Sequence, residues 1–147
     1  KRCNIKSISM MGNVMVNEFA MNQNAYESVL IRDEKVTEAS HCNVFFVKNN
    51  SIYTHPANEY ILDGITRKIV IKLCFDLGLE IKEEAIKQED IINMDEAFLT
   101  GTTTQVVSIK QINTHFYYEN NEIGSITKQI QEAFLTLKQN NAKQNEK

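Results

Sequence analysis

The sequence has little of what marks membrane, secreted or nucleic-acid-binding proteins. No apolar run approaches the ~18 to 20 residues that a membrane-spanning helix needs, so we expect no membrane partner. Lysine and arginine total 16 against 19 aspartate and glutamate residues, and a formal net charge of −3 argues against a nucleic-acid partner. The three cysteines form no CxxC pair, and His41 beside Cys42 has no further ligand at a metal-binding spacing. We therefore expect neither disulfides nor a metal.

Internal boundaries are also missing. There is one proline, Pro56, and no stretch rich in glycine and serine that would mark a linker. With 147 residues, 42% of them hydrophobic, the chain can bury one core. We predict one domain over residues 1–137 and a polar, flexible tail over 138–147. No charged and then apolar leader follows Lys1, and with the unpaired thiols this favours a cytoplasmic protein.

Strand and helix patterns alternate along the rest of the chain. Asn49 and Asn50 predict a hairpin turn, because asparagine tolerates positive φ. Periodicity and β-branched runs predict helices or helical turns at Ile8–Met21, Gly64–Leu77, Gln88–Met94 and Ser125–Lys138, and strands at Ala25–Ile31, Asn43–Lys48, Ser51–His55, Glu80–Lys87, Ala97–Thr100 and Gln105–Ile112. The pattern is that of a mixed α and β domain with several antiparallel hairpins.

The segment Gly64–Leu77 carries the clearest helical pattern. Asp63 is a plausible N-cap, and Gly78 suits the position just after the last turn. Its apolar residues recur at every fourth position and predict a stripe that faces the core: Ile65, Ile69, Leu73 and Leu77.

Two segments have the chemistry of an anion site. Leu62–Arg67 places a glycine and a threonine at the start of a helix, where free backbone N–H groups and the helix dipole favour a phosphate. Thr100–Thr104 is rich in hydroxyls and follows an apolar strand. Ordinary structure explains both equally well, since Asp-Gly often precedes helices and threonine is common in edge strands. By pattern alone, Lys6 is a solvated charge and Glu38 ends a strand in water.

Taken together, five segments give a more specific signal. The chain resembles the C-terminal, cofactor-binding domain of the class IV (fold type IV) aminotransferases, which depend on pyridoxal 5′-phosphate. The resemblance implies an α/β fold (mixed α+β) with a barrel-like mixed β-sheet flanked by helices. It rests on these segments, in this order: Arg2–Ser7, Val36–Phe45, Thr54–Asn58, Ile61–Arg67 and Phe98–Thr103.

The resemblance implies a role for each matching residue. Lys6 corresponds to the lysine that binds the pyridoxal aldehyde and moves the substrate proton, and Glu38 to the carboxylate that faces the pyridine nitrogen. Leu62 corresponds to the apolar residue against the ring face, and Ser40 to a cofactor-binding serine. The positions that correspond to the phosphate cradle are Gly64, Ile65, Thr66, Gly101 and Thr102.

Within the family the chain most resembles the bacterial D-amino acid (D-alanine) aminotransferases. This implies transamination between a D-amino acid and a 2-oxo acid such as 2-oxoglutarate. A branched-chain L-amino acid aminotransferase is the alternative, although Met11 stands where those enzymes carry a tyrosine. An aminodeoxychorismate lyase is less favoured, because Gly64–Arg67 and Gly101–Thr103 keep two signatures that lyases lose.

The N-terminal domain that precedes Lys6 in this family is not part of the 147 residues. In the family that domain, partly from the neighbouring subunit of a homodimer, supplies an arginine for the phosphate and groups that hold the substrate carboxylate. We therefore expect this chain alone to be inactive. An isolated, non-catalytic domain remains the alternative that involves no enzyme activity.

Overall fold

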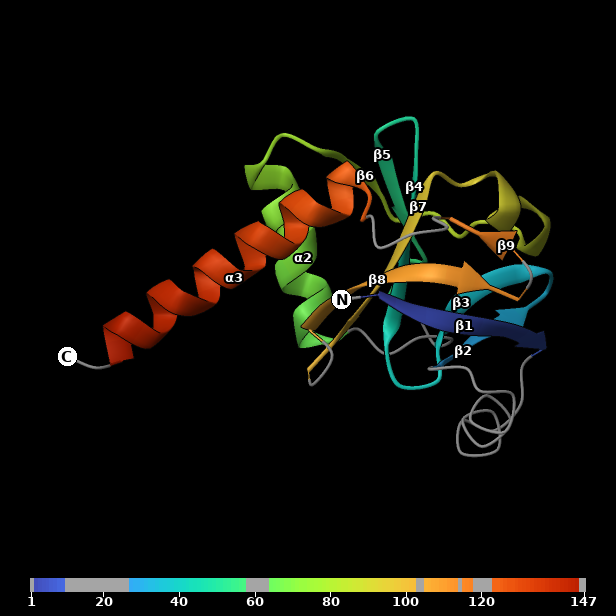
Figure 1. Ribbon diagram of the computed structural model, residues 1–147, viewed down its shortest axis with the longest axis horizontal. Helices are drawn as coiled ribbons and strands as arrows, with labels where there is room; N and C mark the ends of the chain where they lie inside the picture. The colour runs from blue at the N-terminus through green and yellow to red at the C-terminus, as the bar shows by residue number, and fades with distance from the viewer. Residues whose placement is uncertain are drawn as a thin grey trace.

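A mixed β-sheet forms the body of the molecule in the computed structural model, which describes residues 2–9, 27–57, 64–102, 105–113, 115–117 and 123–145 (Figure 1). The strands run in the order β3-β2-β1-β8-β7-β4-β5-β6, with β9 beside β8. The strands are β1 (Arg2–Ser9), β2 (Glu27–Arg32), β3 (Lys35–Ala39), β4 (Asn43–Lys48), β5 (Ser51–Thr54), β6 (Glu80–Lys82), β7 (Glu96–Gly101), β8 (Gln105–Ile112) and β9 (His115–Phe116), and the helices are α2 (Ile65–Asp76), the 3₁₀-helix η1 (Gln88–Asn93) and α3 (Ser125–Asn145).

The two ends of this strand order meet. Val36 in β3 donates its backbone N–H to the carbonyl of Ile86, at 2.9 Å, and Gln88 donates to the carbonyl of Glu34, at 2.7 Å. Ile86 and Gln88 belong to the segment that follows β6, so the sheet curls until its last part bonds to its first strand. The predicted barrel-like mixed sheet flanked by helices is confirmed, and the curl leaves β3 with partners on both sides.

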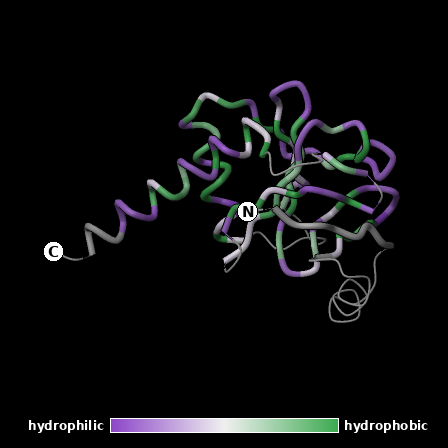
Figure 2. The backbone as a smooth tube through the Cα atoms, in the orientation of Figure 1, coloured by the Kyte–Doolittle hydropathy of each residue, from purple (hydrophilic) through white to green (hydrophobic). Residues whose placement is uncertain are grey.

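Two apolar cores lie on opposite faces of the sheet, because alternate residues of a strand point in opposite directions. One core fills the inside of the curl and includes Val44, Phe46 and Leu99. The other lies under the helices and includes Phe45 and Phe98. The rings of that pair stack with centroids 4.9 Å apart. Figure 2 shows the hydrophobic strands inside the molecule and the hydrophilic hairpin tips at its edge.

Helix α2 buries a different face from the predicted stripe. Its buried residues are Thr66, Arg67, Val70 and Cys74. Ile65 at one end of the stripe is 72% exposed and Leu77 at the other is 42% exposed, so that prediction was wrong. The difference arises because the helix begins beside a cavity, and the residues that face the cavity and the sheet there include the polar Thr66 and Arg67.

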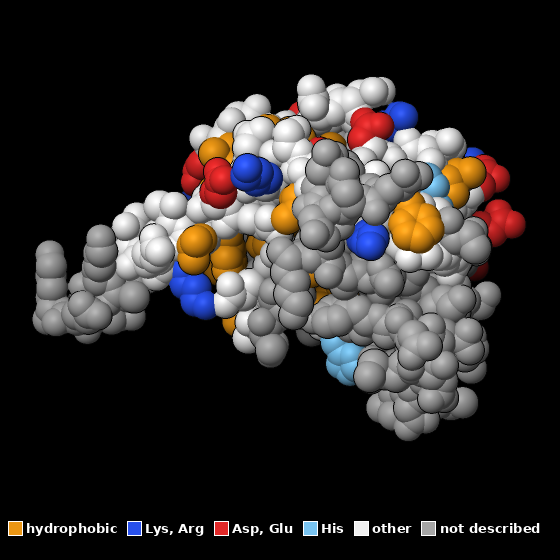
Figure 3. Space-filling view, in the orientation of Figure 1, with side chains coloured by type: hydrophobic (Ala, Val, Ile, Leu, Met, Phe, Trp, Pro, Cys, Tyr) orange, Lys and Arg blue, Asp and Glu red, His pale blue; other side chains and the backbone are white. Residues whose placement is uncertain are grey.

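Figure 3 shows hydrophobic side chains at the surface near the projecting helix α3.

Local turn rules hold well. Gly78 has φ +73° and ends α2 as predicted, with Gly78 N–H bonded to the Phe75 carbonyl and Leu79 N–H to the Cys74 carbonyl. The predicted hairpin is also confirmed, since Asn49 and Asn50 have φ of 52° and 66°.

Most predicted elements differ from the structure by no more than one or two residues at an end, and three differ by more. Ile8 and Ser9 end strand β1 instead of beginning a helix, and the remainder of the predicted helix lies outside the described residues. Strand β6 is shorter than predicted and ends at Lys82. Helix α3 is longer and continues to Asn145, through most of the segment predicted to be a flexible tail. The domain boundary at residue 137 stays a prediction.

A buried carboxylate holds the start of α3 against the sheet. Glu96 in β7 accepts hydrogen bonds from the Thr127 N–H at 2.9 Å, the Thr127 hydroxyl at 2.8 Å and the Ile126 N–H at 3.2 Å. The side chain thus serves the free N–H groups of the first turn and places negative charge at the positive end of the helix dipole. Gly124 leaves the room this needs, because a Cβ there would overlap the Glu96 side chain.

We expect Glu96→Gln to lower the free energy of unfolding by roughly 1–3 kcal/mol, because it removes the charge and one acceptor from buried donors. Chemical denaturation measures this value. Glu132→Gln, on an exposed position of α3, is the matched control and should change stability by less than about 0.5 kcal/mol. Equal effects of the two changes would contradict a role for Glu96 in fixing α3.

Candidate functional site

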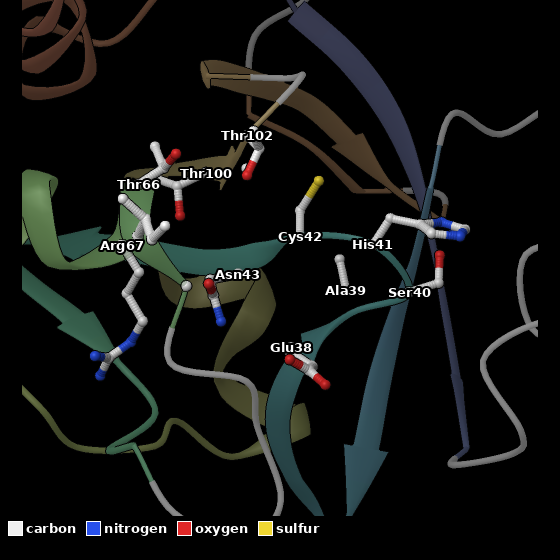
Figure 4. Close-up of a pocket in the computed structure, with 13 residues that line it drawn as sticks. Glu38, Ala39, Ser40, His41, Cys42, Asn43, Thr66, Arg67, Thr100 and Thr102 are labelled. Carbon is white, nitrogen blue, oxygen red and sulfur yellow. The ribbon is translucent and has the colours of Figure 1, made fainter.

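Three separate parts of the chain line one cavity of about 300 Å³ (Figure 4). They are the end of β3 with the turn into β4 (residues 38–43), the start of α2 (residues 64–67) and the end of β7 (residues 100–102). Both segments with the chemistry of an anion site therefore contribute to the same cavity. Of the residues assigned from the resemblance, the cavity is lined by Glu38, Ser40, Gly64, Ile65, Thr66, Gly101 and Thr102.

An irregularity in the sheet sets the position of Glu38. Val29 of β2 pairs with Ala39 of β3, but Ile31 pairs with Val36, so β3 has one residue more than β2 over this stretch. Such a bulge redirects side chains and is frequent beside functional sites. The hydroxyl of Thr37 donates to the Leu30 carbonyl at 3.2 Å and supports the bulge from the buried side. Glu38 is the next-to-last residue of β3 and is partly buried, so it stands at the end of a strand as the alternative has it, but not fully in water.

The sheet register places residue 6 beside this wall of the cavity. Lys6 in β1 pairs with Ser28 in β2, and the Ser28 carbonyl accepts a hydrogen bond of 2.9 Å from the Ser40 N–H. Lys6, Ser28 and Ser40 therefore form one row across β1, β2 and the first residue after β3. Leu62, the other residue assigned from the resemblance, lies outside the described residues.

The start of α2 is arranged to receive a ligand. Gly64 is the N-cap, in place of the predicted Asp63, and no side chain caps the helix there. The first backbone N–H groups of α2 thus lie at the cavity, where the helix dipole adds partial positive charge. A Cβ on Gly64 would lie 2.9 Å from the Asn43 side-chain oxygen, so a larger residue at position 64 would displace the Asn43 side chain.

Within the part of the chain that the structure describes, two buried hydroxyls at the cavity have no hydrogen-bond partner. They belong to Ser40, which is 5% exposed, and Thr100, which is 0% exposed. A buried hydroxyl without a partner costs about 1–3 kcal/mol, so such groups usually have a role. The cavity therefore contains groups that suit a polar ligand.

A buried arginine completes the base of the cavity. Arg67 is 2% exposed, and its Nη2 donates to the His55 carbonyl at 2.9 Å and to Glu83 Oε1 at 2.8 Å. Glu83 is half exposed, so this carboxylate offsets the buried positive charge only in part. No role for Arg67 or Asn43 follows from the sequence. Both residues stand out only through contacts with residues distant in the chain, and hydrophobic periodicity does not reveal such contacts.

In the described part of the chain, no group of three or more histidine, cysteine, aspartate or glutamate residues could hold a metal ion. No described helix is long and apolar enough to cross a membrane.

Comparison with known proteins identifies the family. The pattern of the class IV amino-transferases matches residues 1–112, and the chain therefore belongs to that family. It is 41% identical over 132 residues to a D-alanine aminotransferase of Bacillus licheniformis, covering 90% of this chain and 46% of that protein. It is 39% identical over 133 residues to a D-alanine aminotransferase of Staphylococcus haemolyticus, covering 90% and 47%. The chain thus spans about half the length of the curated relatives it matches.

Solved structures have the same fold. A branched-chain aminotransferase of Thermoproteus uzoniensis superposes with a TM-score of 0.84 at 26% identity, over 91% of this chain and 50% of that one. An aminotransferase of Brucella abortus, solved with bound pyridoxal phosphate, gives a TM-score of 0.84 at 24% identity, over 93% and 54%. The architecture of this chain is that of fold type IV aminotransferases.

We expect Gly64→Ala to destabilise the protein by about 1 kcal/mol, since the added Cβ displaces the Asn43 carboxamide. Gly64 has φ −66°, so backbone strain contributes nothing to this effect. A double-mutant cycle with Asn43→Ala, measured by thermal unfolding, should recover most of the loss. Additive effects of the two substitutions would contradict the proposed steric contact.

Proposed function

We propose that the longer protein containing this chain is a pyridoxal-phosphate-dependent aminotransferase that acts on D-amino acids, with D-alanine as donor and a 2-oxo acid such as 2-oxoglutarate as acceptor. Residues 1–137 form its cofactor-binding domain. The proposal rests on one observation: the start of α2, several hydroxyls and Glu38 line the same cavity.

The residues present fit this cofactor. The cavity of about 300 Å³ is at the lower end of the roughly 300–1,000 Å³ typical of small-molecule sites. The unpartnered Ser40 and Thr100 hydroxyls and the close approach at Gly64 suit a ligand with many oxygen atoms. Phosphate matches the positive end of α2, and a carboxylate such as Glu38 matches a protonated ring nitrogen.

Each assigned residue has one task in this proposal. The backbone of Gly64 and Ile65, the hydroxyls of Thr66 and Thr102 and the flexible Gly101 hold the phosphate, so that the ring has a fixed position. Glu38 keeps the proton on the ring nitrogen by charge pairing. Ser40 lies at the wall beside Glu38, and Leu62 packs against the ring face.

The chemistry divides between the cofactor and one lysine. When bound, pyridoxal phosphate supplies an electron sink for the charge that develops at the substrate Cα. Lys6 would take the proton from the substrate Cα and deliver it to the C4′ carbon of the cofactor, and its strand position beside Ser28 supports this assignment. Donor and acceptor then react in turn at the same site, which gives ping-pong kinetics.

The parent protein also acts as a homodimer in this proposal, as the family resemblance implies. The resemblance of the whole chain supports the dimer. A cytoplasmic location is proposed on the unpaired thiols.

Borohydride reduction tests the role of Lys6. In the full-length protein loaded with pyridoxal phosphate, reduction should attach the cofactor to Lys6, as found by peptide mapping. Lys6→Ala should lose the label and at least about 10³-fold in kcat, since both the attachment and the proton transfer depend on this amine. Lys48→Ala, at the opposite end of β4, should keep the label. Labelling of another lysine in the wild-type protein would refute the assignment.

Donor preference separates the two candidate substrate classes. The D-alanine aminotransferases at 41% and 39% identity support a D-amino acid, whereas the branched-chain enzyme of T. uzoniensis has the same fold. We expect kcat/KM for D-alanine to exceed that for L-leucine by at least about tenfold. A preference for L-leucine would establish the branched-chain alternative.

The 147-residue chain alone should show no turnover in the same assay, because half of the positioning contacts are missing. Turnover by this chain would show that the remaining length of the parent protein is dispensable.

A further inference from the structure

Thr100 differs from three other buried threonines of the same fold, whose hydroxyls have hydrogen-bond partners. The hydroxyl of Thr37 donates to the Leu30 carbonyl, that of Thr54 to the Val44 carbonyl, and that of Thr127 to Glu96. Thr100 is as buried as these three, at 0% exposed, yet its hydroxyl has no partner. Hydrogen bonds to backbone carbonyls therefore explain why threonine stands at positions 37 and 54, and no such bond explains Thr100.

The surroundings of Thr100 make the hydroxyl more unusual. Its neighbours on β7, Phe98 and Leu99, are fully buried apolar residues, and valine has the same shape as threonine. A core strand gains nothing from an unpaired hydroxyl at this position. What distinguishes position 100 is that it pairs with Asn43 at the end of β4 and lines the cavity.

The cavity near Thr100 suits a phosphate group. Figure 4 shows Thr66, Thr100 and Thr102 on the same side of the cavity, contributed by α2, by β7 and by the turn after β7. The uncapped start of α2 lies with them. A phosphate has several acceptor oxygens and can take a hydrogen bond from each of three hydroxyls as well as from the backbone.

On these observations we infer that Thr100 is a phosphate-binding residue, whose hydroxyl donates a hydrogen bond to the phosphate of the bound cofactor. Thr100 lines the cavity, and rotation about its Cα–Cβ bond moves the hydroxyl among three staggered positions without any movement of the backbone. The inference rests on the proposed function, and it adds a residue to which the family resemblance assigns no role.

Binding of pyridoxal phosphate and of pyridoxal to the full-length protein tests the inference, because the two ligands differ only in the phosphate. Dissociation constants come from absorbance or fluorescence titration. In Thr100→Val the constant for pyridoxal phosphate should rise about tenfold, the effect of about one hydrogen bond to a charged group, while that for pyridoxal stays within about twofold. Thr100→Ser keeps the hydroxyl and should bind pyridoxal phosphate as the wild-type protein does.

Thermal unfolding without ligand gives a second readout. Thr100→Val should unfold at a temperature no lower than the wild-type protein, because the hydroxyl that it removes has no partner. Thr54→Val is the matched control: it should unfold at a lower temperature, because it loses a hydrogen bond of 3.0 Å, and should keep the wild-type ratio of the two dissociation constants.

The outcomes are distinct. If Thr100→Val has the same ratio of dissociation constants as the wild-type protein, Thr100 is no phosphate ligand and the proposed function is unaffected. If the wild-type protein binds neither ligand, the proposed function fails and the inference fails with it. Should Thr100→Val not fold, Thr100→Ala compared with Thr100→Ser gives the same decision.

Discussion

The pairing of β4 with β7 is the contact on which the rest of the molecule depends. These antiparallel strands contribute to both apolar cores, with Phe46 and Leu99 on one face and the stacked rings of Phe45 and Phe98 on the other. One end of the pair carries Asn43 opposite Thr100, at the cavity. Near the other end, Glu96 fixes α3. A change of register here would disturb both cores and the site together.

The site uses rigid elements and leaves several polar groups for a ligand. Close packing on both sides of β4 and β7 holds Thr100 where its hydroxyl finds no protein partner, and the glycine at position 64 allows α2 to start beside it. Such an arrangement stores an unfavourable free energy in the empty protein, which a ligand can relieve. Preorganised donors of this kind need little rearrangement on binding, which favours tight and oriented association.

Much of the fold follows from local rules, and the exceptions have a common cause. The turn at Asn49 and Asn50 and the helix end at Gly78 follow from the backbone freedom of single residues. The face of α2 was not predictable in this way, because Arg67 is buried by partners that lie 12 and 16 residues away. Strand β1 was also missed, since its pairing with β2 and β8 depends on distant segments.

The candidate site shows the same division. The resemblance identified the segments around Glu38, Thr66 and Thr102, and the fold brings them to one cavity. It gave no role to Asn43, Arg67 or Thr100. A threonine in a strand has an ordinary explanation in β propensity, and only the absence of a partner for its buried hydroxyl shows otherwise.

The place of β1 in the sheet also affects how the protein is made. This strand is the first described element of the chain, yet it lies between β2 and β8 and runs parallel to both. During synthesis Arg2–Ser9 leaves the ribosome long before Gln105–Ile112, so the edge of β1 that pairs with β8 has no partner until β8 has emerged. The strand that carries Lys6 therefore gains its second partner only when nearly the whole domain has emerged.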